Sequence, residues 1–146
     1  MGSEMCIRDS SIEQYGGITI FNDCYNANPE STESALCCLK KLKGKRKIAV
    51  LADMLELGEV SSFLHRRVGK FAGELKIDAL FAYGEFSSEV VAGAEEAGLK
   101  NSFSFKDKKK LLKELVAYIS PGDCLLVKGS RKTKMEEIVE RLKDML

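Results

Sequence analysis

Four polar side chains lie within ten residues near the start of the chain, at positions 22–31: Asp23, Tyr25, Asn26 and Asn28. Each can donate or accept hydrogen bonds, and they follow an apolar run at residues 18–21. A segment with helical periodicity comes after Pro29, a residue that a helix start tolerates. The pattern predicts a strand, a polar turn and a helix, and open α/β sheets bind ligands at the carboxyl ends of such strands. The alternative is a capped helix start, although capping needs one such residue rather than four.

A second group of polar residues follows the apolar run at 47–52. Asp53 and Glu56 lie in the loop after this run, and His65 lies near the start of the next helical segment, 61–75. Because neighbouring parallel strands end at one edge of a sheet, we expect the two acids to face the same crevice as the first turn. Two alternatives remain open: the acids could cap loops, and a lone His at a helix start is often a hydrogen-bonded packing residue.

The third group follows a short apolar run at 124–127 and consists of Lys128, Gly129, Ser130 and Arg131. It combines two cations, a hydroxyl and a glycine that permits close backbone approach. A helix expected to start near Thr133 would direct its free N–H groups towards this turn. The pattern predicts an anion site, in which Arg131 grips the anion through two parallel hydrogen bonds and Lys128 acts as a point charge. The alternative is a pair of solvated loop charges.

Strand-like and helix-like segments alternate along the chain. The expected strands are 12–15, 18–21, 47–52, 79–83, 102–105 and 124–127, and the expected helices are 31–42, 61–75, 87–97, 108–119 and 133–145. A Gly-Gly pair between the first two strands favours a tight hairpin turn. Short strands that alternate with longer helices imply βαβ units. The predicted fold class is therefore α/β, a Rossmann-like open, mostly parallel sheet with helices on both faces and an N-terminal β-hairpin.

The composition is that of one globular domain. The 146 residues are 45% apolar and 31% charged, with a formal net charge of +1 that offers no field to select nucleic acid or an anionic membrane. No apolar stretch approaches the roughly 20 residues of a membrane span. We therefore expect no nucleic acid and no membrane among the partners. The five cysteines are odd in number and lack the spacing of a zinc site, which predicts a cytoplasmic location and no metal site.

Common catalytic and nucleotide-binding signatures are missing from the sequence. Neither the phosphate loop Gly-x-x-x-x-Gly-Lys-Ser/Thr nor a Gly-x-Gly-x-x-Gly after the first strand occurs. Cys24 would need a nearby base to act as a nucleophile, and the chain has a single His. We therefore assign no catalytic residue.

The first ten residues are set apart from the rest. Residues 1–10 lack the periodicity of any element, and residues 5–10 look like the translation of a sequencing adaptor. We expect a non-native or disordered tail at 1–10 and a folded domain at 11–146.

Three motifs in order resemble the C-terminal domain of the Mur ligase family. They are Asp-Cys-Tyr-Asn-Ala-Asn-Pro at 23–29, Val-Leu-Ala-Asp-Met-Leu-Glu-Leu-Gly at 50–58 followed by His65, and Leu-Val-Lys-Gly-Ser-Arg at 126–131 followed by Met135-Glu136. The resemblance covers roughly residues 12–146 and is greatest to the member that adds D-alanyl-D-alanine to UDP-MurNAc-tripeptide. Ala52 departs from the pattern, which has glycine there, so the backbone at that turn is less free.

The resemblance implies a fragment of an ATP-dependent ligase that makes a peptidoglycan precursor. In such ligases an N-terminal domain holds the UDP-sugar, a central domain holds ATP and Mg²⁺, and the C-terminal domain binds the dipeptide and closes over the nucleotide. The substrate carboxylate is activated as an acyl phosphate, which the dipeptide amine attacks. We therefore expect the N-terminal and central domains to be missing partners, and the fragment alone to bind no cofactor and to be inactive.

The resemblance also implies roles for the three groups of residues. The first turn, with Asp23, Tyr25, Asn26 and Asn28, would approach the ribose and adenine of ATP. Lys128 to Arg131, together with Asp53, Glu56 and His65, would bind D-alanyl-D-alanine, whose C-terminal carboxylate would be the anion. The alternative, from another class of function, is a stand-alone α/β binding or regulatory module.

Overall fold

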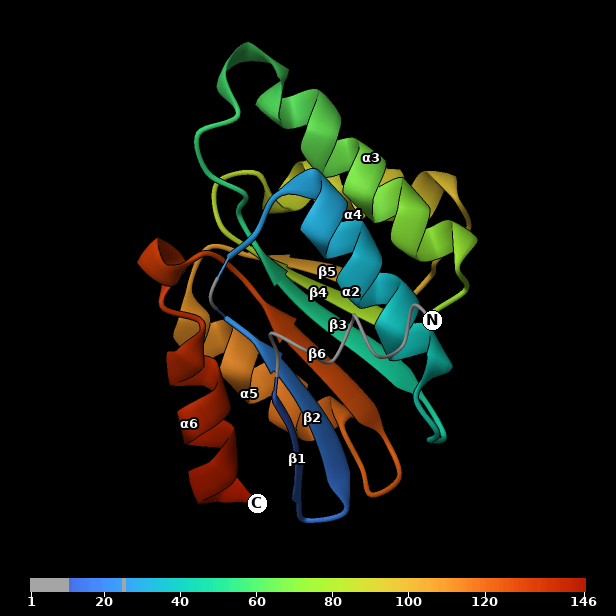
Figure 1. Ribbon diagram of the computed structural model, residues 1–146, viewed down its shortest axis with the longest axis vertical. Coiled ribbons are helices and arrows are strands. Elements are labelled where there is room, and N and C mark those ends of the chain that lie inside the picture. The colour runs from blue at the N-terminus through green and yellow to red at the C-terminus, as the bar shows by residue number, and fades with distance from the viewer. Residues whose placement is uncertain (1–10, 25) are drawn as a thin grey trace.

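A mixed sheet forms the centre of the structure, a computed structural model that describes residues 11–24 and 26–146 (Figure 1). Within these residues, six strands lie in the order β1-β2-β6-β3-β4-β5. The strands are β1 Ser11–Tyr15, β2 Ile18–Asp23, β3 Lys47–Ala52, β4 Ala79–Tyr83, β5 Ser102–Phe105 and β6 Cys124–Lys128. β1 pairs antiparallel with β2, and the other neighbours pair in parallel. The predicted sheet and its N-terminal hairpin are confirmed, whereas the tail expected at 1–10 lies outside the described residues.

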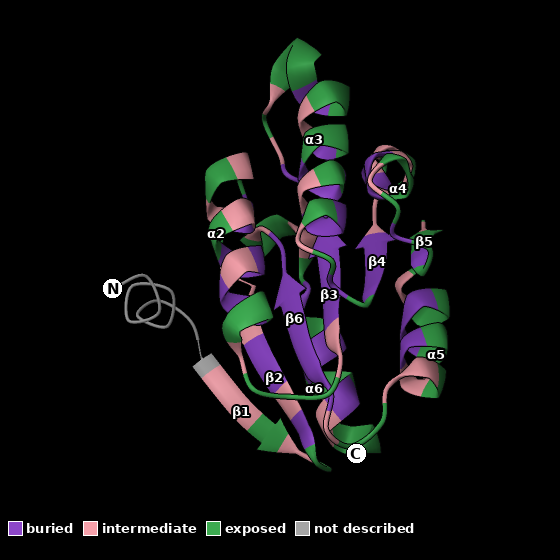
Figure 2. Ribbon diagram, turned by 90° about the vertical axis from the view of Figure 1, so that its right-hand side faces the viewer, coloured by how far each residue is buried: buried purple, intermediate pink, exposed green. Residues whose placement is uncertain are grey.

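Helices cover both faces of the sheet, as predicted (Figures 1 and 2). The described helices are α2 Pro29–Lys41, α3 Ser61–Glu74, α4 Ser87–Glu96, α5 Lys108–Tyr118 and α6 Glu136–Met145, with the short 3-10 helices η1 Gly58–Val60 and η2 Arg131–Thr133. Helices α2, α3 and α4 pack on one face, and α5 and α6 pack on the other. Among the described residues, no helix combines the length and the apolar character that crossing a membrane requires.

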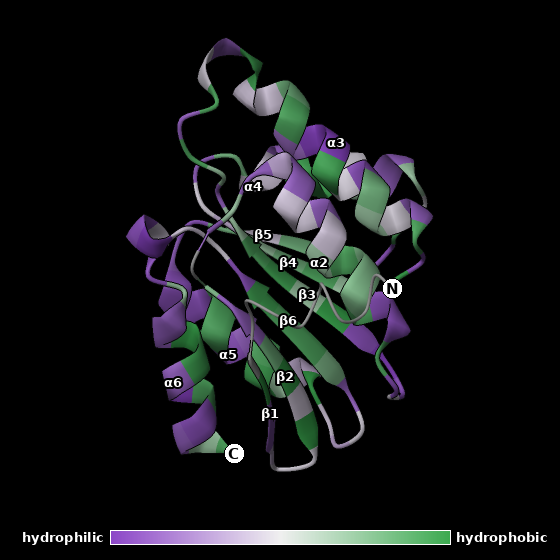
Figure 3. Ribbon diagram, viewed as in Figure 1, coloured by the Kyte–Doolittle hydropathy of each residue, from purple (hydrophilic) through white to green (hydrophobic). Residues whose placement is uncertain are grey.

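The central strands are apolar on both sides because helices cover both sides. In β6, Leu126 packs into the core beneath α2, α3 and α4, whereas Leu125 and Val127 pack beneath α5 and α6. Figure 2 shows the middle strands as buried, and Figure 3 shows the same strands as hydrophobic. This arrangement explains why these strands read as continuous apolar runs rather than as an alternation of apolar and polar residues.

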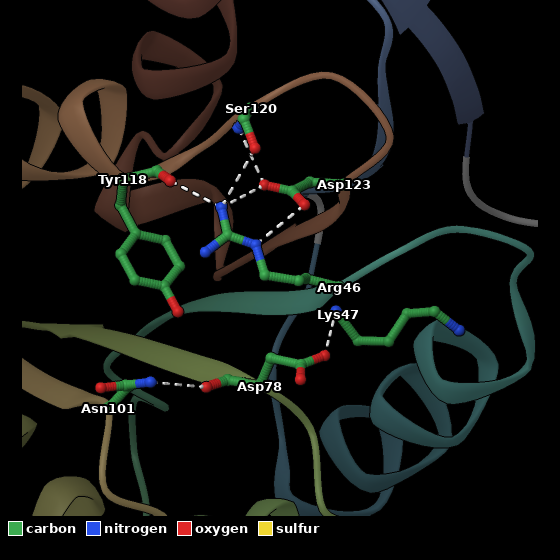
Figure 4. Close-up of polar contacts among 7 residues, drawn as sticks. All are labelled: Arg46, Lys47, Asp78, Asn101, Tyr118, Ser120 and Asp123. Carbon is green, nitrogen blue, oxygen red and sulfur yellow. Dashed lines mark hydrogen bonds and ion pairs between the residues drawn. The ribbon is translucent and has the colours of Figure 1, made fainter.

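At the end of the sheet where the parallel strands begin, Arg46 joins three segments (Figure 4). Its guanidinium donates to both carboxylate oxygens of Asp123, at 3.0 and 2.7 Å, and to the Tyr118 carbonyl oxygen at 2.7 Å. Asp123 is 1% exposed. The hydrogen bond to this carboxylate raises the pKa of Arg46. The network fastens the end of α5 to the starts of β3 and β6.

Helices α3 and α4 cross at a very short distance, and glycine makes this possible. A Cβ atom on Gly69 of α3 would lie 1.8 Å from the Val90 carbonyl oxygen. A Cβ atom on Gly93 of α4 would lie 1.9 Å from the Arg66 carbonyl oxygen. In a helix interior, glycine is about 1 kcal/mol less favourable than alanine. The close crossing therefore requires glycine at both positions in spite of its low helix propensity.

We predict that Gly69→Ala lowers the free energy of unfolding by about 1–2 kcal/mol, because the cost of pushing α4 away from α3, about 3 kcal/mol for so close a contact, exceeds the gain in helix propensity of about 1 kcal/mol. Urea denaturation followed by circular dichroism measures this change. The control is Lys70→Ala, at an exposed position one residue along α3, which should change the stability by no more than about 0.5 kcal/mol. A Gly69→Ala variant as stable as the wild type would contradict the close crossing.

Candidate functional site

A buried ion pair between Lys128 and Asp23 joins the carboxyl ends of β6 and β2. The parallel register places the two residues side by side, and Lys128 Nζ lies 2.7 Å from Asp23 Oδ2. The ammonium group also donates to the Asn26 carbonyl oxygen at 2.8 Å. Lys128 is 2% exposed, so these two acceptors have to offset the cost of removing its charge from water. Lys128 thereby holds the turn between β2 and α2 against the sheet.

The other polar residues of this turn cap backbone groups. Asn28 is the N-cap of α2, where its Oδ1 accepts from the Ser31 amide at 2.8 Å. Asn26 Oδ1 accepts from the amide of the next residue at 2.9 Å. The capping alternative thus describes Asn28, whereas Asp23 keeps 16% of its side chain exposed beside Lys128. Nucleotide binding by these residues stays a prediction, and Tyr25 lies outside the described residues.

Cys24 in the same turn is not an activated nucleophile. Burial, followed by the charges of Glu136 and Asp23, raises the pKa of its thiol to about 12. Its Sγ donates a hydrogen bond to the Val127 carbonyl oxygen at 3.7 Å. The thiol therefore stays protonated near neutral pH, whereas a nucleophilic cysteine needs its thiolate.

The turn after β6 packs tightly against the sheet. A Cβ atom on Gly129 would lie 2.6 Å from Thr133 Oγ1 and 3.0 Å from the Cβ of Ala52, so a larger residue would push the turn outwards. Ser130 Oγ is buried and has no hydrogen-bond partner within the described residues. Arg131, the next residue, is exposed. A close backbone approach, an unsatisfied hydroxyl and an exposed cation are thus brought together here.

The last helix starts later than the sequence predicted. We expected it to begin near Thr133, but α6 begins at Glu136. The residues before it form η2, and Lys134 then has a left-handed backbone with φ of 53°. Thr133 Oγ1 donates to the Ser130 carbonyl oxygen at 2.6 Å, which tightens this turn. The prediction that helical N–H groups directly follow the turn was wrong, because the left-handed residue interrupts the helix.

In the second loop, Asp53 caps the turn between β4 and α4. Its two oxygens accept from the Glu85 amide at 2.8 Å and from the Phe86 amide at 3.0 Å. Gly84 leaves room for this carboxylate, since a Cβ atom there would lie 2.4 Å from the carboxylate carbon. The alternative that the acids cap loops thus describes Asp53, although the turn that it caps was not identified from the sequence. A glycine directly after a strand is the signal that points to a close approach.

Glu56 and His65, in and after the same loop, have opposite surroundings. Glu56 is exposed, with a left-handed backbone of φ 60°. His65 is 1% exposed, and its Nε2 accepts from the Met54 amide at 2.9 Å. His65 therefore fits the packing alternative, and any role in binding has to be indirect. Substrate binding by Asp53, Glu56 and His65 stays a prediction.

A groove of about 700 Å³ opens at the same edge, between the first turns of α5 and α6. Tyr83, Leu112 and Ile138 supply apolar parts of its lining. None of the described residues that we predicted for the site lines this groove. In the described part of the chain, no group of three or more His, Cys, Asp or Glu side chains could hold a metal ion.

We predict that Lys128→Met lowers the free energy of unfolding by about 3 kcal/mol, because it leaves the Asp23 carboxylate without its buried partner. Urea denaturation measures the change. Lys132→Met, at an exposed position in η2, is the control and should stay within about 0.5 kcal/mol of the wild type. Adding Asp23→Asn to Lys128→Met should restore part of the stability, since the unpaired charge is then gone. Wild-type stability of the single variant Lys128→Met would show that the pair contributes nothing.

The chain is similar to known ligases over most of its length. Residues 8–131 match the family described as Mur ligase, glutamate ligase domain. The UDP-N-acetylmuramoyl-tripeptide–D-alanyl-D-alanine ligase of Bacillus subtilis (strain 168) is 38% identical over 133 residues, which cover 90% of this chain and 29% of that ligase.

Two solved structures share the fold. The crystal structure of MurF from Acinetobacter baumannii has a TM-score of 0.83 and 30% identity, and the match covers 92% of this chain and 29% of that one. MurF ligase from Thermotoga maritima in complex with ADP has a TM-score of 0.74 and 28% identity, and the match covers 92% of this chain and 30% of that one. This chain thus spans less than a third of the length of these relatives. On the match over residues 8–131 and on its shared fold, the chain belongs to the Mur ligase family.

Proposed function

We propose that this chain is the dipeptide-binding part of a ligase that joins D-alanyl-D-alanine to UDP-MurNAc-tripeptide in peptidoglycan synthesis. The activity named for the Bacillus subtilis relative supports this proposal. Because the chain spans 29% of that ligase, the other parts of such an enzyme would bind the UDP-sugar and most of ATP and Mg²⁺. Such an enzyme would act in the cytoplasm, where its nucleotide substrates are made.

The observation that carries the proposal is the arrangement around Ser130. Its hydroxyl is buried without a partner in the described residues, and the exposed Arg131 follows it. A carboxylate at this turn would accept two parallel hydrogen bonds from the guanidinium group, and the Ser130 hydroxyl would reach it by rotating out of its buried position. D-alanyl-D-alanine carries such a carboxylate at its C-terminus. Lys128 would act indirectly, because its ammonium group is already held by Asp23.

The first turn suits the sugar of a nucleotide. The Asp23 carboxylate accepts a hydrogen bond from Lys128 and is still 16% exposed, so it can also accept from ribose hydroxyls. The Asn26 side chain is exposed beside it. ATP would supply the phosphoryl group that activates the substrate carboxylate. The residues of this chain would hold the dipeptide in an orientation that brings its amine to that carboxylate.

We predict that residues 11–146 can replace the matching part of the Bacillus subtilis ligase and restore activity, because the two are 38% identical over 133 residues. The chimera should release phosphate from ATP only when UDP-MurNAc-tripeptide and D-alanyl-D-alanine are both present. The isolated chain should release none above the blank, since its described residues form no phosphate loop. A folded chimera that ignores D-alanyl-D-alanine, or an isolated chain that hydrolyses ATP, would contradict the proposal.

We predict that D-alanyl-D-alanine shifts the amide NMR signals of Gly129 and Ser130, because its carboxylate binds at this turn. Arg131→Ala should abolish the shifts, whereas Lys132→Ala, an exposed neighbour, should leave them unchanged. The same dipeptide with an amidated C-terminus should produce none. If the amidated dipeptide binds as well as the free acid, the carboxylate assignment is wrong.

A further inference from the structure

The imidazole of His65 joins three separate segments. The ring is 1% exposed. Its Nε2 accepts from the Met54 amide at 2.9 Å, and its Nδ1 lies 2.7 Å from the Ser61 carbonyl oxygen. The Phe86 ring stacks on it, with ring centroids 4.6 Å apart and planes 19° from parallel. One buried side chain thus connects the loop after β3, the start of α3 and the turn before α4.

These contacts determine where the ring carries its hydrogen. The Met54 amide is a donor, so Nε2 has to offer a lone pair. The Ser61 carbonyl oxygen is an acceptor, so Nδ1 has to carry the hydrogen. A neutral imidazole in the Nδ1–H tautomer satisfies both contacts, and a hydrogen on Nε2 would face the Met54 amide donor to donor.

Asp53 lies beside this ring but is bound elsewhere. Its Oδ1 is 3.9 Å from His65 Nε2, a nitrogen without a hydrogen to donate. Its oxygens instead accept from the Glu85 and Phe86 amides. Asp53 therefore holds the turn whose aromatic ring covers His65. The loop after β3 and the turn after β4 are fastened to each other by these two side chains together.

The loop that begins at Met54 needs such an anchor. Glu56 and Gly58 both have a left-handed backbone, with φ of 60° and 65°. For a residue other than glycine this conformation costs about 1–2 kcal/mol. Leu57 packs against the core, but Glu56 is exposed. The conformation of the loop therefore also depends on how firmly the backbone is held at Met54.

We propose that His65 is a positioning residue of the ligase reaction, whose neutral imidazole holds the Met54 backbone and so fixes the loop at residues 53–58. It acts without touching the substrate, because both of its ring nitrogens are already bonded. The assignment to this reaction rests on the proposed function, since it places dipeptide binding at the same edge of the sheet. The hydrogen bond by which His65 holds the Met54 amide belongs to this chain alone and does not depend on the proposed function.

Two substitutions distinguish the loss of the Met54 hydrogen bond from the loss of ring packing on Phe86. In His65→Gln, Oε1 lies as many bonds from Cβ as Nε2 does, so it can accept from the Met54 amide. In His65→Asn, the side-chain amide can replace Nδ1 as the donor to the Ser61 carbonyl oxygen, but it is too short to reach Met54. Both variants lose the ring that stacks on Phe86, so they are matched in that respect.

Nitrogen NMR and hydrogen exchange on this chain test the anchor. His65 should show a protonated Nδ1 and an unprotonated Nε2. The Met54 amide should exchange about tenfold faster in His65→Asn than in His65→Gln, because the shorter side chain leaves it without an acceptor. The Leu126 amide, in the middle of β6, reports whether both variants remain folded. Equal exchange at Met54 in the two folded variants, or a protonated Nε2 in the wild type, would overturn the proposal.

Kinetics of the chimera test the link to the reaction. His65→Asn should have a kcat/KM for D-alanyl-D-alanine about tenfold below that of His65→Gln, with the KM for UDP-MurNAc-tripeptide equal in both. Equal kcat/KM values in an active chimera would overturn the positioning role while the ligase function stands. A chimera that is inactive with His65 in place would overturn the proposed function and this assignment, and exchange at Met54 would still decide on the anchor.

Discussion

The buried ammonium group of Lys128, at the end of β6, determines how the turns at the carboxyl ends of the strands are arranged. Lys128 ends a strand that lies between β2 and β3, and its charge is almost completely removed from water. A buried charge persists only where acceptors surround it. The Asp23 carboxylate and the Asn26 carbonyl oxygen meet this need. For the Asn26 carbonyl oxygen to reach the ammonium group, the chain has to fold back over the end of β6. The start of α2 follows from this turn.

The polar groups are placed differently at the two ends of the parallel strands. At the amino edge, Arg46 and Asp123 satisfy each other and fasten α5 to the strands. At the carboxyl edge, the buried hydroxyl of Ser130 lacks a partner in the described residues, and Glu56 and Arg131 are exposed. Proteins commonly carry binding groups on loops that a rigid scaffold positions. Paired side chains hold both ends of the parallel strands in place, and the turns at the carboxyl end also expose Glu56 and Arg131.

Much of the fold could be predicted because its signals are local. The strands 79–83 and 102–105 were predicted at their observed bounds, since apolar runs between turn residues mark them. The start of α6 was missed because a 3-10 turn and a left-handed residue, Lys134, leave no simple pattern in a polar segment. The bond of Asp53 to the Phe86 amide was missed for a different reason. It joins two loops whose proximity follows from the pairing of β3 with β4.

The sequence by itself determined the α/β class, the hairpin, the family and the edge of the sheet where its polar motifs meet. These properties follow from the order of apolar runs and turns along the chain. The tertiary structure decided what each polar residue does at that edge. Lys128 and Arg131 are cations of one short motif, yet one is buried against Asp23, a residue 105 positions away, and the other is exposed. The surroundings of a side chain are set by the strands and turns that pack beside it, and spacing along the chain does not encode them.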